Sequence, residues 1–301
     1  MIKKAILPVA GMGTRFLPVT KASPKEMLPI VDKPVIQYIV EEAVKSGIEE
    51  IIFVTGKGKQ AIEDYFDDDE YLVRLLTEKN KINELNEIKK LENIAKIIYV
   101  RQHHPLGDGH AILCAEHCIS KGEDFAVLFG DDIIDSNSPA LKQLIDVYNE
   151  KKTSVICTQE ITGKEIENYG VVGFSNSITP THISKKEELL NISKLVRVTS
   201  LQEKPKKEEA LSNLGIIGKY VCTNDIFDAI KSSKKTNNEE LKLIDGFKVF
   251  LENKKEIYAK IIEGTRYDTG SKIGWLNANI AFAMKNENMR NEIIKSLKKY
   301  V

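Results

Sequence analysis

The chain has 301 residues, of which 42% are hydrophobic and 29% charged, with 44 basic residues against 44 acidic ones. This composition is typical of a globular protein, and a formal net charge of zero excludes a global attraction to nucleic acid or to an anionic membrane. No apolar run approaches the roughly 20 residues that span a bilayer, and the start has too few apolar residues for a signal peptide. We therefore expect a cytoplasmic protein with no nucleic-acid or membrane partner.

The first half of the chain alternates short β-branched runs with segments of helical periodicity. This alternation predicts a parallel sheet with crossover helices. Apolar residues at helical spacing between Ile36 and Val44 predict a helix that starts near Pro34 and ends before Gly47. The predicted strands are nearly continuous in apolar residues, as strands buried on both faces are, and span 4–9, 51–55, 97–100 and 125–129.

The charged stretch 60–92 carries a Leu and Ile pattern that predicts helices, which we expect to lie over the edge of the sheet. The acidic run 67–69 inside it is interpreted as a solvated turn and not as a cation site.

The second half is less regular, and 179–192 is interpreted as a polar excursion. From Ser271 onward the pattern is helical, with Trp275, Ile280, Phe282 and Ala283 as packing positions. The whole pattern predicts one α/β domain over 1–301, with a Rossmann-like mixed, mostly parallel sheet flanked by helices and C-terminal helices over 271–301. The strands predicted in this half are 171–174, 195–201 and 215–223.

Four cysteines (Cys114, Cys118, Cys157 and Cys222) include no Cys-x-x-Cys pair, and we expect them to be reduced. His110, Cys114, His117 and Cys118 stand at helical spacing and would face a zinc ion if the segment is helical. The favoured interpretation is a buried helix in which the cysteines pack as small apolar side chains.

A glycine-rich loop follows the first predicted strand. Gly11 and Gly13 allow a tight turn whose amides approach an anion, and Arg15 and Lys25 add positive charge for a triphosphate. The loop is not a dinucleotide fingerprint, because Phe16 stands where that motif needs glycine, and no Gly-Lys-Ser/Thr closes a Walker motif. Taken alone, the loop also fits a tight strand-to-helix turn with surface cations.

An ordered set of motifs decides between these interpretations. They are Gly-Met-Gly-Thr-Arg at 11–15, Lys-Glu-Met-Leu-Pro at 25–29, Leu-Gly-Asp-Gly-His-Ala at 106–111, Gly-Asp-Asp at 130–132, Asn-Tyr-Gly-Val-Val at 168–172, Glu-Lys-Pro at 203–205 and Tyr-Asp-Thr-Gly at 267–270. With them the chain resembles the sugar nucleotidyltransferases, most closely the bacterial UTP:glucose-1-phosphate uridylyltransferases (UDP-glucose pyrophosphorylases). The resemblance covers nearly the whole chain and implies the nucleotide-diphospho-sugar transferase fold.

The activity that the resemblance implies is attack by a phosphate oxygen of glucose 1-phosphate on the α-phosphorus of UTP, which gives UDP-glucose and pyrophosphate. It implies a Mg²⁺ ion on Asp131, with Asp268 as a second carboxylate and Asp132 as a supporting or capping residue. It also implies a nucleotide-binding half over 1–135 and a sugar-phosphate-binding half over 136–270.

The resemblance further implies that Arg15 and Lys25 hold the triphosphate, that Lys204 clamps the sugar phosphate and that Glu203 accepts hydrogen bonds from sugar hydroxyls. No general base is expected, because a phosphate monoester is already an anion near neutral pH. Tyr169 is expected to pack. Uracil is expected to be read by the Gln102 amide and by the backbone of Ala10, Gly11 and Gly107. The remaining substrate contacts are expected at Gly13, Glu26 and Gly170, where Gly170 lets the main chain approach the sugar.

Two residues depart from the family pattern. Asp108 replaces an apolar or basic residue, which we expect to weaken triphosphate binding slightly, and Gly130 stands where Pro often precedes the metal aspartate. Two alternatives stay open at this point: a nucleotidyltransferase that uses dTTP or CTP with another sugar 1-phosphate, and a non-catalytic nucleotide-sugar-binding regulator. We also expect a homo-oligomer formed through the helices around Trp275.

Overall fold

The computed structural model describes residues 1–174, 194–233 and 240–299. The four strands predicted in the first half are confirmed, and they pair in parallel in the order β5-β4-β1-β6. Each is nearly continuous in apolar residues because helices cover both faces of the sheet. Their bounds are β1 (Lys4–Pro8), β4 (Glu50–Thr55), β5 (Lys96–Arg101) and β6 (Phe125–Leu128).

The second half of the chain extends the same sheet, which is mixed as predicted. Within the described residues the sheet has nine strands in the order β5-β4-β1-β6-β11-β8-β12-β10-β9. Parallel pairing recurs only between β8 and β12 in this half, and the other pairs are antiparallel. The bounds are β8 (Val155–Glu160), β9 (Gly170–Phe174), β10 (Leu195–Glu203), β11 (Leu214–Cys222) and β12 (Tyr258–Ile261).

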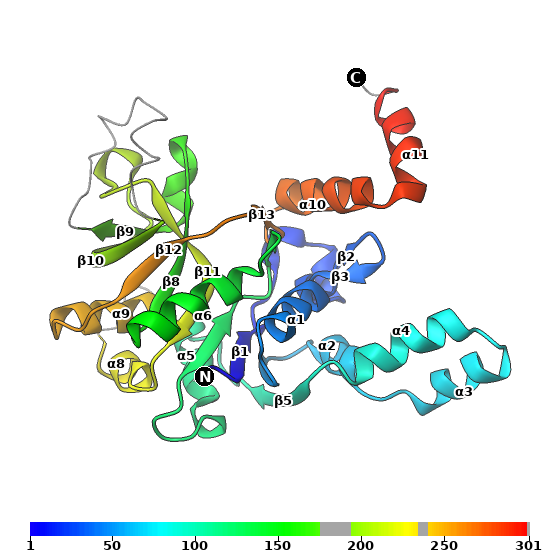
Figure 1. The fold of residues 1–301 in the computed structure, drawn as a ribbon, viewed down its shortest axis with the longest axis horizontal. Coiled ribbons are helices and arrows are strands. Elements are labelled where there is room, and N and C mark those ends of the chain that lie inside the picture. The colour runs from blue at the N-terminus through cyan, green and yellow to red at the C-terminus, as the bar shows by residue number, and fades with distance from the viewer. Residues whose placement is uncertain (175–193, 234–239, 300–301) are drawn as a thin grey trace.

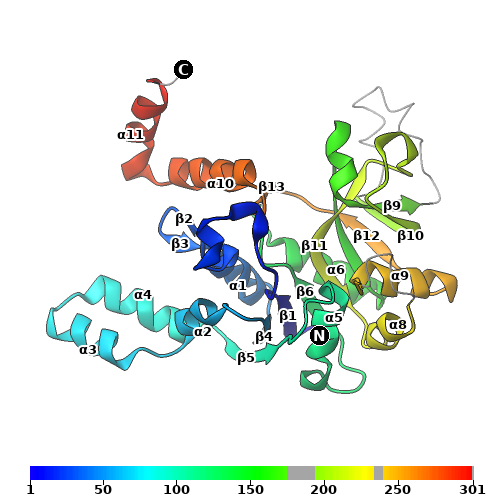
Figure 2. The ribbon, with the colours of Figure 1, turned by 180° about the vertical axis from the view of Figure 1, so that it is seen from behind.

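Helices flank both faces of the sheet (Figures 1 and 2), and a hydrophobic cluster fills the space between helices and sheet on each face. In β1, Ala5 and Leu7 face one cluster and Ile6 faces the other, as the two-residue period of a strand requires. On the first face lie α1 (Val35–Lys45) and α6 (Ala140–Lys151). On the second face lie α5 (Asp108–Cys114), α8 (Ile226–Ser232) and α9 (Leu243–Glu252).

The helices predicted over 60–92 are present, but only the first lies on the sheet as predicted. Helix α2 (Gln60–Phe66) packs at the edge, since its buried Phe66 stacks on Phe53 of β4. Helices α3 (Glu70–Glu78) and α4 (Ile82–Glu92) form an arm that projects away from the sheet beyond β5 (Figure 1), and β5 stays half-buried. The reason is composition: α3 buries no side chain and α4 buries only Leu91, so the arm has too little apolar surface to cover an edge.

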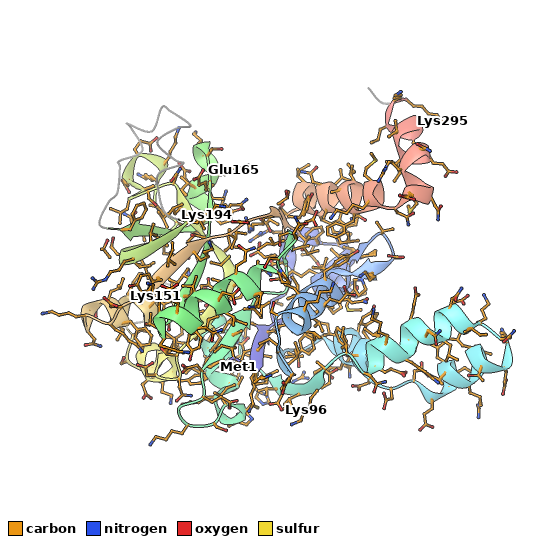
Figure 3. All side chains as sticks on the ribbon, in the orientation of Figure 1. Met1, Lys96, Lys151, Glu165, Lys194 and Lys295 are labelled. Carbon is orange, nitrogen blue, oxygen red and sulfur yellow. The ribbon has the colours of Figure 1, made fainter. Side chains whose placement is uncertain are left out.

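The C-terminal helices are confirmed as α10 (Lys272–Lys285) and α11 (Glu287–Leu297), with Ala278 and Ala283 buried. The Trp275 indole N–H donates to the carbonyl of Pro29 at 3.1 Å, which fixes α10 to the small hairpin of β2 (Pro29–Ile30) and β3 (Lys33–Pro34). Helix α11 turns away from the body and carries Lys295, labelled in Figure 3.

The His and Cys segment is helical only as far as Cys114, and a 3-10 turn follows over Glu116–Cys118. His110 Nδ1 lies 3.0 Å from the Gln102 amide nitrogen, and within the described ranges no three His, Cys, Asp or Glu side chains could hold a metal together. Cys114 and Cys118 are half-buried, whereas Cys157 and Cys222 are buried. The two cysteines of this segment are therefore only partly buried, whereas the favoured interpretation placed them in a buried helix.

The predicted polar excursion 179–192 lies outside the described residues. Among the residues that the structure describes, no helix has the length and apolar character needed to cross a membrane.

Candidate active site

The glycine-rich loop and Asp131 meet at one edge of the sheet. Strands β1 and β6 are parallel neighbours, with Ala5 opposite Ala126, so the loops that follow them lie side by side. A cavity of about 1040 Å³ opens there. The predicted site residues that line it are Arg15, Asp131, Gly170, Glu203, Lys204 and Asp268.

Lys25 does not line this cavity, but it contacts a residue that does. Its ammonium nitrogen lies 2.5 Å from Oδ2 of Asp131. Burial lowers the pKa of Lys25, but the Asp131 and Glu26 carboxylates outweigh burial and leave the pKa above its ordinary value. Burial raises the pKa of Asp131, and Lys25 more than reverses it, so the net shift is downward. Both groups are therefore charged at neutral pH.

The loop residues beside this ion pair are tightly packed. Gly13 has a φ of +64°, and a Cβ there would lie 3.1 Å from the Lys25 Cβ, so a larger residue would displace Lys25. Glu26, predicted to contact substrate, is 1% exposed and accepts from the Lys59 ammonium at 2.6 Å. Burial raises the pKa of Glu26 and lowers the pKa of Lys59. The structure thus places Glu26 behind the loop, in a buried pair.

Two carboxylates converge beside Gly270. A Cβ on this glycine would lie 2.7 Å from Oδ2 of Asp131 and 3.0 Å from Oδ1 of Asp268, so both oxygens border the same small space. Thr269 holds the turn, because its backbone N–H and its hydroxyl both donate to the Asp131 carbonyl. Burial, followed by the Asp132 carboxylate, raises the pKa of Asp268. One or two carboxylates are the set that Mg²⁺ uses beside substrate phosphates, so these residues fit the ion that the resemblance implies.

Asp132 faces a different partner. Its Oδ1 accepts from Nε of Arg266 at 2.6 Å, and its Oδ2 accepts from the Gly218 N–H at 3.0 Å. Arg266 also donates to the Tyr169 hydroxyl at 2.9 Å. Burial lowers the pKa of Arg266, and Asp132 outweighs it and raises the pKa. Tyr169 packs against a small apolar cluster and also lines the cavity. Its interpretation as a packing residue alone is corrected accordingly.

The Glu-Lys-Pro motif stands at the end of β10. Lys204 is exposed and has a φ of +47°, a left-handed conformation that is costly for a residue with a side chain and clusters at functional sites. Glu203 accepts from the Lys242 ammonium at 2.7 Å. Gly170 starts β9 beside them, and a Cβ there would lie 3.1 Å from Ile216. The motif therefore borders the same cavity as Arg15 and Asp131.

The residues predicted to read uracil lie next to the cavity but do not line it. Gln102 is buried, and its Nε2 donates to the Gly107 carbonyl at 3.0 Å, so the amide holds the loop that follows. Gly107 has a φ of +102°. Ala10 and Gly11 lie on the first loop, where Ala10 packs against Gly56.

Sequence reasoning missed several polar residues of the site. Arg266, Lys242 and Lys59 each neutralise a motif carboxylate, yet each is a single cation in a charged sequence. The signal for Arg266 is its position directly before Tyr-Asp-Thr-Gly, while Lys242 and Lys59 carry no local signal. The departure at Asp108 has a structural role, since its Oδ1 accepts from the Leu243 N–H at 2.7 Å and caps α9. Gly130 is packed against Val9 and Glu26, where a Cβ would lie about 3 Å from both.

Comparisons with known proteins show the family of the chain. A model of the nucleotidyl transferase family matches residues 4–284. The chain is 46% identical over 298 residues to UTP–glucose-1-phosphate uridylyltransferase 2 of Staphylococcus saprophyticus, covering 99% of this chain and 98% of the relative. It is 44% identical over 296 residues to a UTP–glucose-1-phosphate uridylyltransferase of Bacillus subtilis, covering 98% of this chain and 94% of the relative.

Solved structures give the same result. A UDP-glucose pyrophosphorylase complexed with UDP-glucose has a TM-score of 0.82 and 38% identity, covering 95% of this chain and all of that one. A UTP-bound enzyme from Acinetobacter baumannii has a TM-score of 0.86 and 35% identity, covering 99% of both chains. The match covers the Gly-rich loop, the Asp131 turn and the helices that frame the cavity, so the chain belongs to the nucleotidyl transferase family, as its motifs indicated.

Proposed function

We propose that this protein transfers the uridylyl group of UTP to glucose 1-phosphate and releases UDP-glucose and pyrophosphate. The observation that carries the proposal is that one cavity brings together Arg15, Asp131, Glu203 and Lys204, from motifs far apart in the sequence. Relatives that share over 40% identity along the whole chain are named for this reaction.

The two substrates are both polyanions, and their repulsion at close range amounts to several kcal/mol at a protein-like dielectric. Arg15 and Lys25 on the first loop would hold the triphosphate and stabilise charge as pyrophosphate leaves. Lys204, which lines the same cavity, would clamp the phosphate of the sugar. Because the attacking phosphate oxygen is already anionic, positioning and electrostatics suffice, and no side chain needs to remove a proton.

We also propose that Asp131 and Asp268 hold a Mg²⁺ ion. When bound, such an ion neutralises phosphate charge and polarises the phosphoryl group. The chain's own contribution is to favour the charged form of both carboxylates. Lys25 keeps the pKa of Asp131 low, and Arg266 pairs with Asp132 and acts against the rise in the pKa of Asp268.

The remaining proposed roles divide between the two halves of the chain. We propose that 1–135 binds the nucleotide, with Gln102 and the backbone of Ala10, Gly11 and Gly107 around uracil. Residues 136–270 would bind the sugar phosphate, with Glu203 accepting from the sugar hydroxyls and Gly170 allowing close approach of the main chain. Glu26 would act through Lys59 and Lys25, since it is buried away from the cavity.

The substrate assignment is tested by offering UTP, dTTP, CTP and ATP in turn with glucose 1-phosphate and Mg²⁺ and measuring pyrophosphate release. We expect UTP to give the highest kcat/KM. Thymine adds only one methyl group to uracil, so a hydrophobic pocket would separate the two by about 10- to 200-fold. A kcat/KM with dTTP above that with UTP would overturn the uridylyl assignment, and no turnover with any nucleotide would favour a binding protein.

Asp131→Asn tests the metal and charge assignment. Loss of the carboxylate removes the ligand and leaves Lys25 without its partner, so we expect kcat to fall by at least about 100-fold, the scale of losing one electrostatic stabiliser. Asp135→Asn is the matched control, because Asp135 lies on the adjacent strand β7 (Asp132–Asp135) and pairs with Lys285 away from the cavity. Circular dichroism checks the fold of both variants, and a fully active Asp131→Asn protein would place the metal elsewhere.

We further propose a homo-oligomer in which the C-terminal helices meet a second copy, and a cytoplasmic location for a reaction between UTP and a sugar phosphate. The support for the oligomer is a shallow apolar groove of about 580 Å³ at the base of α10, between Phe16, Val19 and Trp275. Leu276 lines this groove, and Ile294 and Leu297 on α11 are further exposed apolar side chains.

A further inference from the structure

A three-residue segment, Leu241 to Leu243, lies between the two proposed substrate subsites. On one side it contacts the loop 106–110, whose last residues form the first turn of α5, through backbone hydrogen bonds. The Leu241 N–H donates to the Leu106 carbonyl, and the Gly109 N–H donates to the Leu241 carbonyl, both at 2.8 Å. The approach is so close that a Cβ on Gly107 would lie 2.4 Å from the Leu241 oxygen. The loop and the segment therefore form one backbone-paired unit.

Asp108 adds a side-chain contact to this unit. Its Oδ1 accepts from the Leu243 N–H at 2.7 Å, which satisfies one of the free donors at the start of α9. Asp108 thus fixes the direction in which the chain enters the helix, and with it the position of Lys242, the residue immediately before. The loop that carries Asp108 is the one held by Gln102 through the Gly107 carbonyl.

Lys242 points to the other subsite. Its ammonium donates to Oε1 of Glu203 at 2.7 Å, and both side chains line the cavity. Burial lowers the pKa of Lys242, and the hydrogen bond with Glu203 outweighs burial and raises the pKa, so the amine stays charged. A carboxylate can rotate about its side chain, and one charge-assisted hydrogen bond selects the rotamer. The other oxygen of Glu203, for which the described residues supply no hydrogen bond, is thereby left to accept from an outside donor.

We propose that Asp108 and Lys242 are positioning residues: Asp108 holds segment 241–243 against the loop 106–110, and Lys242 orients the Glu203 carboxylate toward the sugar. The inference rests on the proposed function, because it takes Glu203 as the acceptor of sugar hydroxyls. The loop beside the proposed uracil site thereby sets the geometry of the proposed sugar site through three consecutive residues. These residues link the proposed nucleotide-binding and sugar-phosphate-binding halves.

The test compares the dissociation constants of UDP-glucose and UDP, whose ratio reports the glucose contacts alone. Lys242→Met removes the ammonium but keeps the aliphatic stem, and we expect it to weaken UDP-glucose binding about tenfold while UDP binding stays the same. Lys242→Arg, which restores the charge, should recover most of the loss. Lys231→Met on α8, an exposed lysine paired with Glu116, is the matched control.

Asp108→Ala tests the link between the subsites. It should also weaken UDP-glucose binding, and its effect on the ratio should disappear when Lys242 is already Met, because Asp108 acts through Lys242. Asp108→Asn keeps an oxygen that can accept from Leu243 and should stay near the wild-type ratio. The proposal would be overturned if Asp108→Ala and Lys242→Met changed the ratio of the two dissociation constants independently, so that their effects multiply in the double variant. An unchanged ratio in Lys242→Met would overturn it as well.

The two proposals fail in different ways. A wild-type protein that binds UDP-glucose no more tightly than UDP would contradict the assigned sugar site and hence the proposed function. Amide hydrogen exchange then still measures the link, because Asp108→Ala should accelerate exchange of the Leu241 N–H, which hydrogen-bonds to the loop. Unchanged exchange at Leu241 in that variant would overturn the positioning role of Asp108 whatever the substrate.

Discussion

Asp108 illustrates what a buried carboxylate contributes at the scale of one residue. Burial raises its pKa to about 6, with the hydrogen bond from Leu243 acting in the opposite direction. The folded protein therefore holds a proton on Asp108 that the unfolded chain has already released, over the window from the ordinary value of 3.8 up to about 6. Within this window the folded state binds more protons, so its stability from this group falls as the pH rises.

Asp108→Asn should remove this pH dependence. The amide cannot ionise, and its oxygen can still cap α9, so the variant should gain stability over the wild type as the pH rises from 4 to 7. The gain should reach about 1 to 3 kcal/mol above pH 6. Urea unfolding of both proteins at several pH values measures the difference between their free energies of unfolding. The contributions of the other titrating groups cancel in this difference. A difference that stays constant across this range would mean that Asp108 does not titrate abnormally.

At the scale of elements, a buried ion pair joins three of them. Lys219 on β11 is fully buried, and its ammonium lies 3.0 Å from Oε2 of Glu42 on α1. The other oxygen of Glu42 accepts from the Leu141 N–H in the first turn of α6 at 3.0 Å. The pair thus fixes the sheet to both helices of one face. Desolvation of two charges offsets most of their attraction, so its presence adds little net stability, whereas loss of one partner is costly.

Lys219→Met should destabilise the protein by about 3 to 5 kcal/mol, because Glu42 is left as an unpaired buried charge. The double variant Glu42→Gln/Lys219→Met removes both charges and keeps an oxygen for Leu141, so it should recover much of the loss. Urea unfolding at pH 7 measures both. A double variant no more stable than Lys219→Met would show that the cost comes from packing and not from charge.

At the scale of the whole molecule, the hydrophobic periodicity of the sequence was sufficient to predict the elements whose structure is determined by packing on the sheet. The parallel strands, α1 and the C-terminal helices were predictable because each has a continuous apolar run or stripe. The arm 70–92 was misplaced because its pattern gives helices but not their partners. Strands β8 and β12 were not predicted, since their place in the sheet depends on pairing partners distant in the sequence.

The residues of the candidate site also differ in how far the sequence predicts them. Arg15, Asp131, Glu203 and Lys204 were predictable because they stand in motifs at the ends of strands, where loops converge. Arg266, Lys242 and Lys59 act through a carboxylate that folding brings to them, and no local pattern marks such a cation. Glu26 and Gln102 stand in or near motifs, yet the structure shows them as buried supports of the loops.

The C-terminal helices provide the last prediction, which concerns the assembly of whole chains. Leu276 on α10 and Leu297 on α11 are 48% and 41% exposed, and an apolar surface of this kind on a projecting element is typical of an interface. We expect a solution mass of at least twice the 33.9 kDa of one chain, measured by sedimentation velocity over a range of concentrations. Leu276→Glu and Leu297→Glu place a charge in the interface and should each shift the mass toward one chain. Ile82→Glu, on the exposed arm, is the control and should leave the mass unchanged, whereas a wild-type protein that sediments as a single chain would contradict the proposed homo-oligomer.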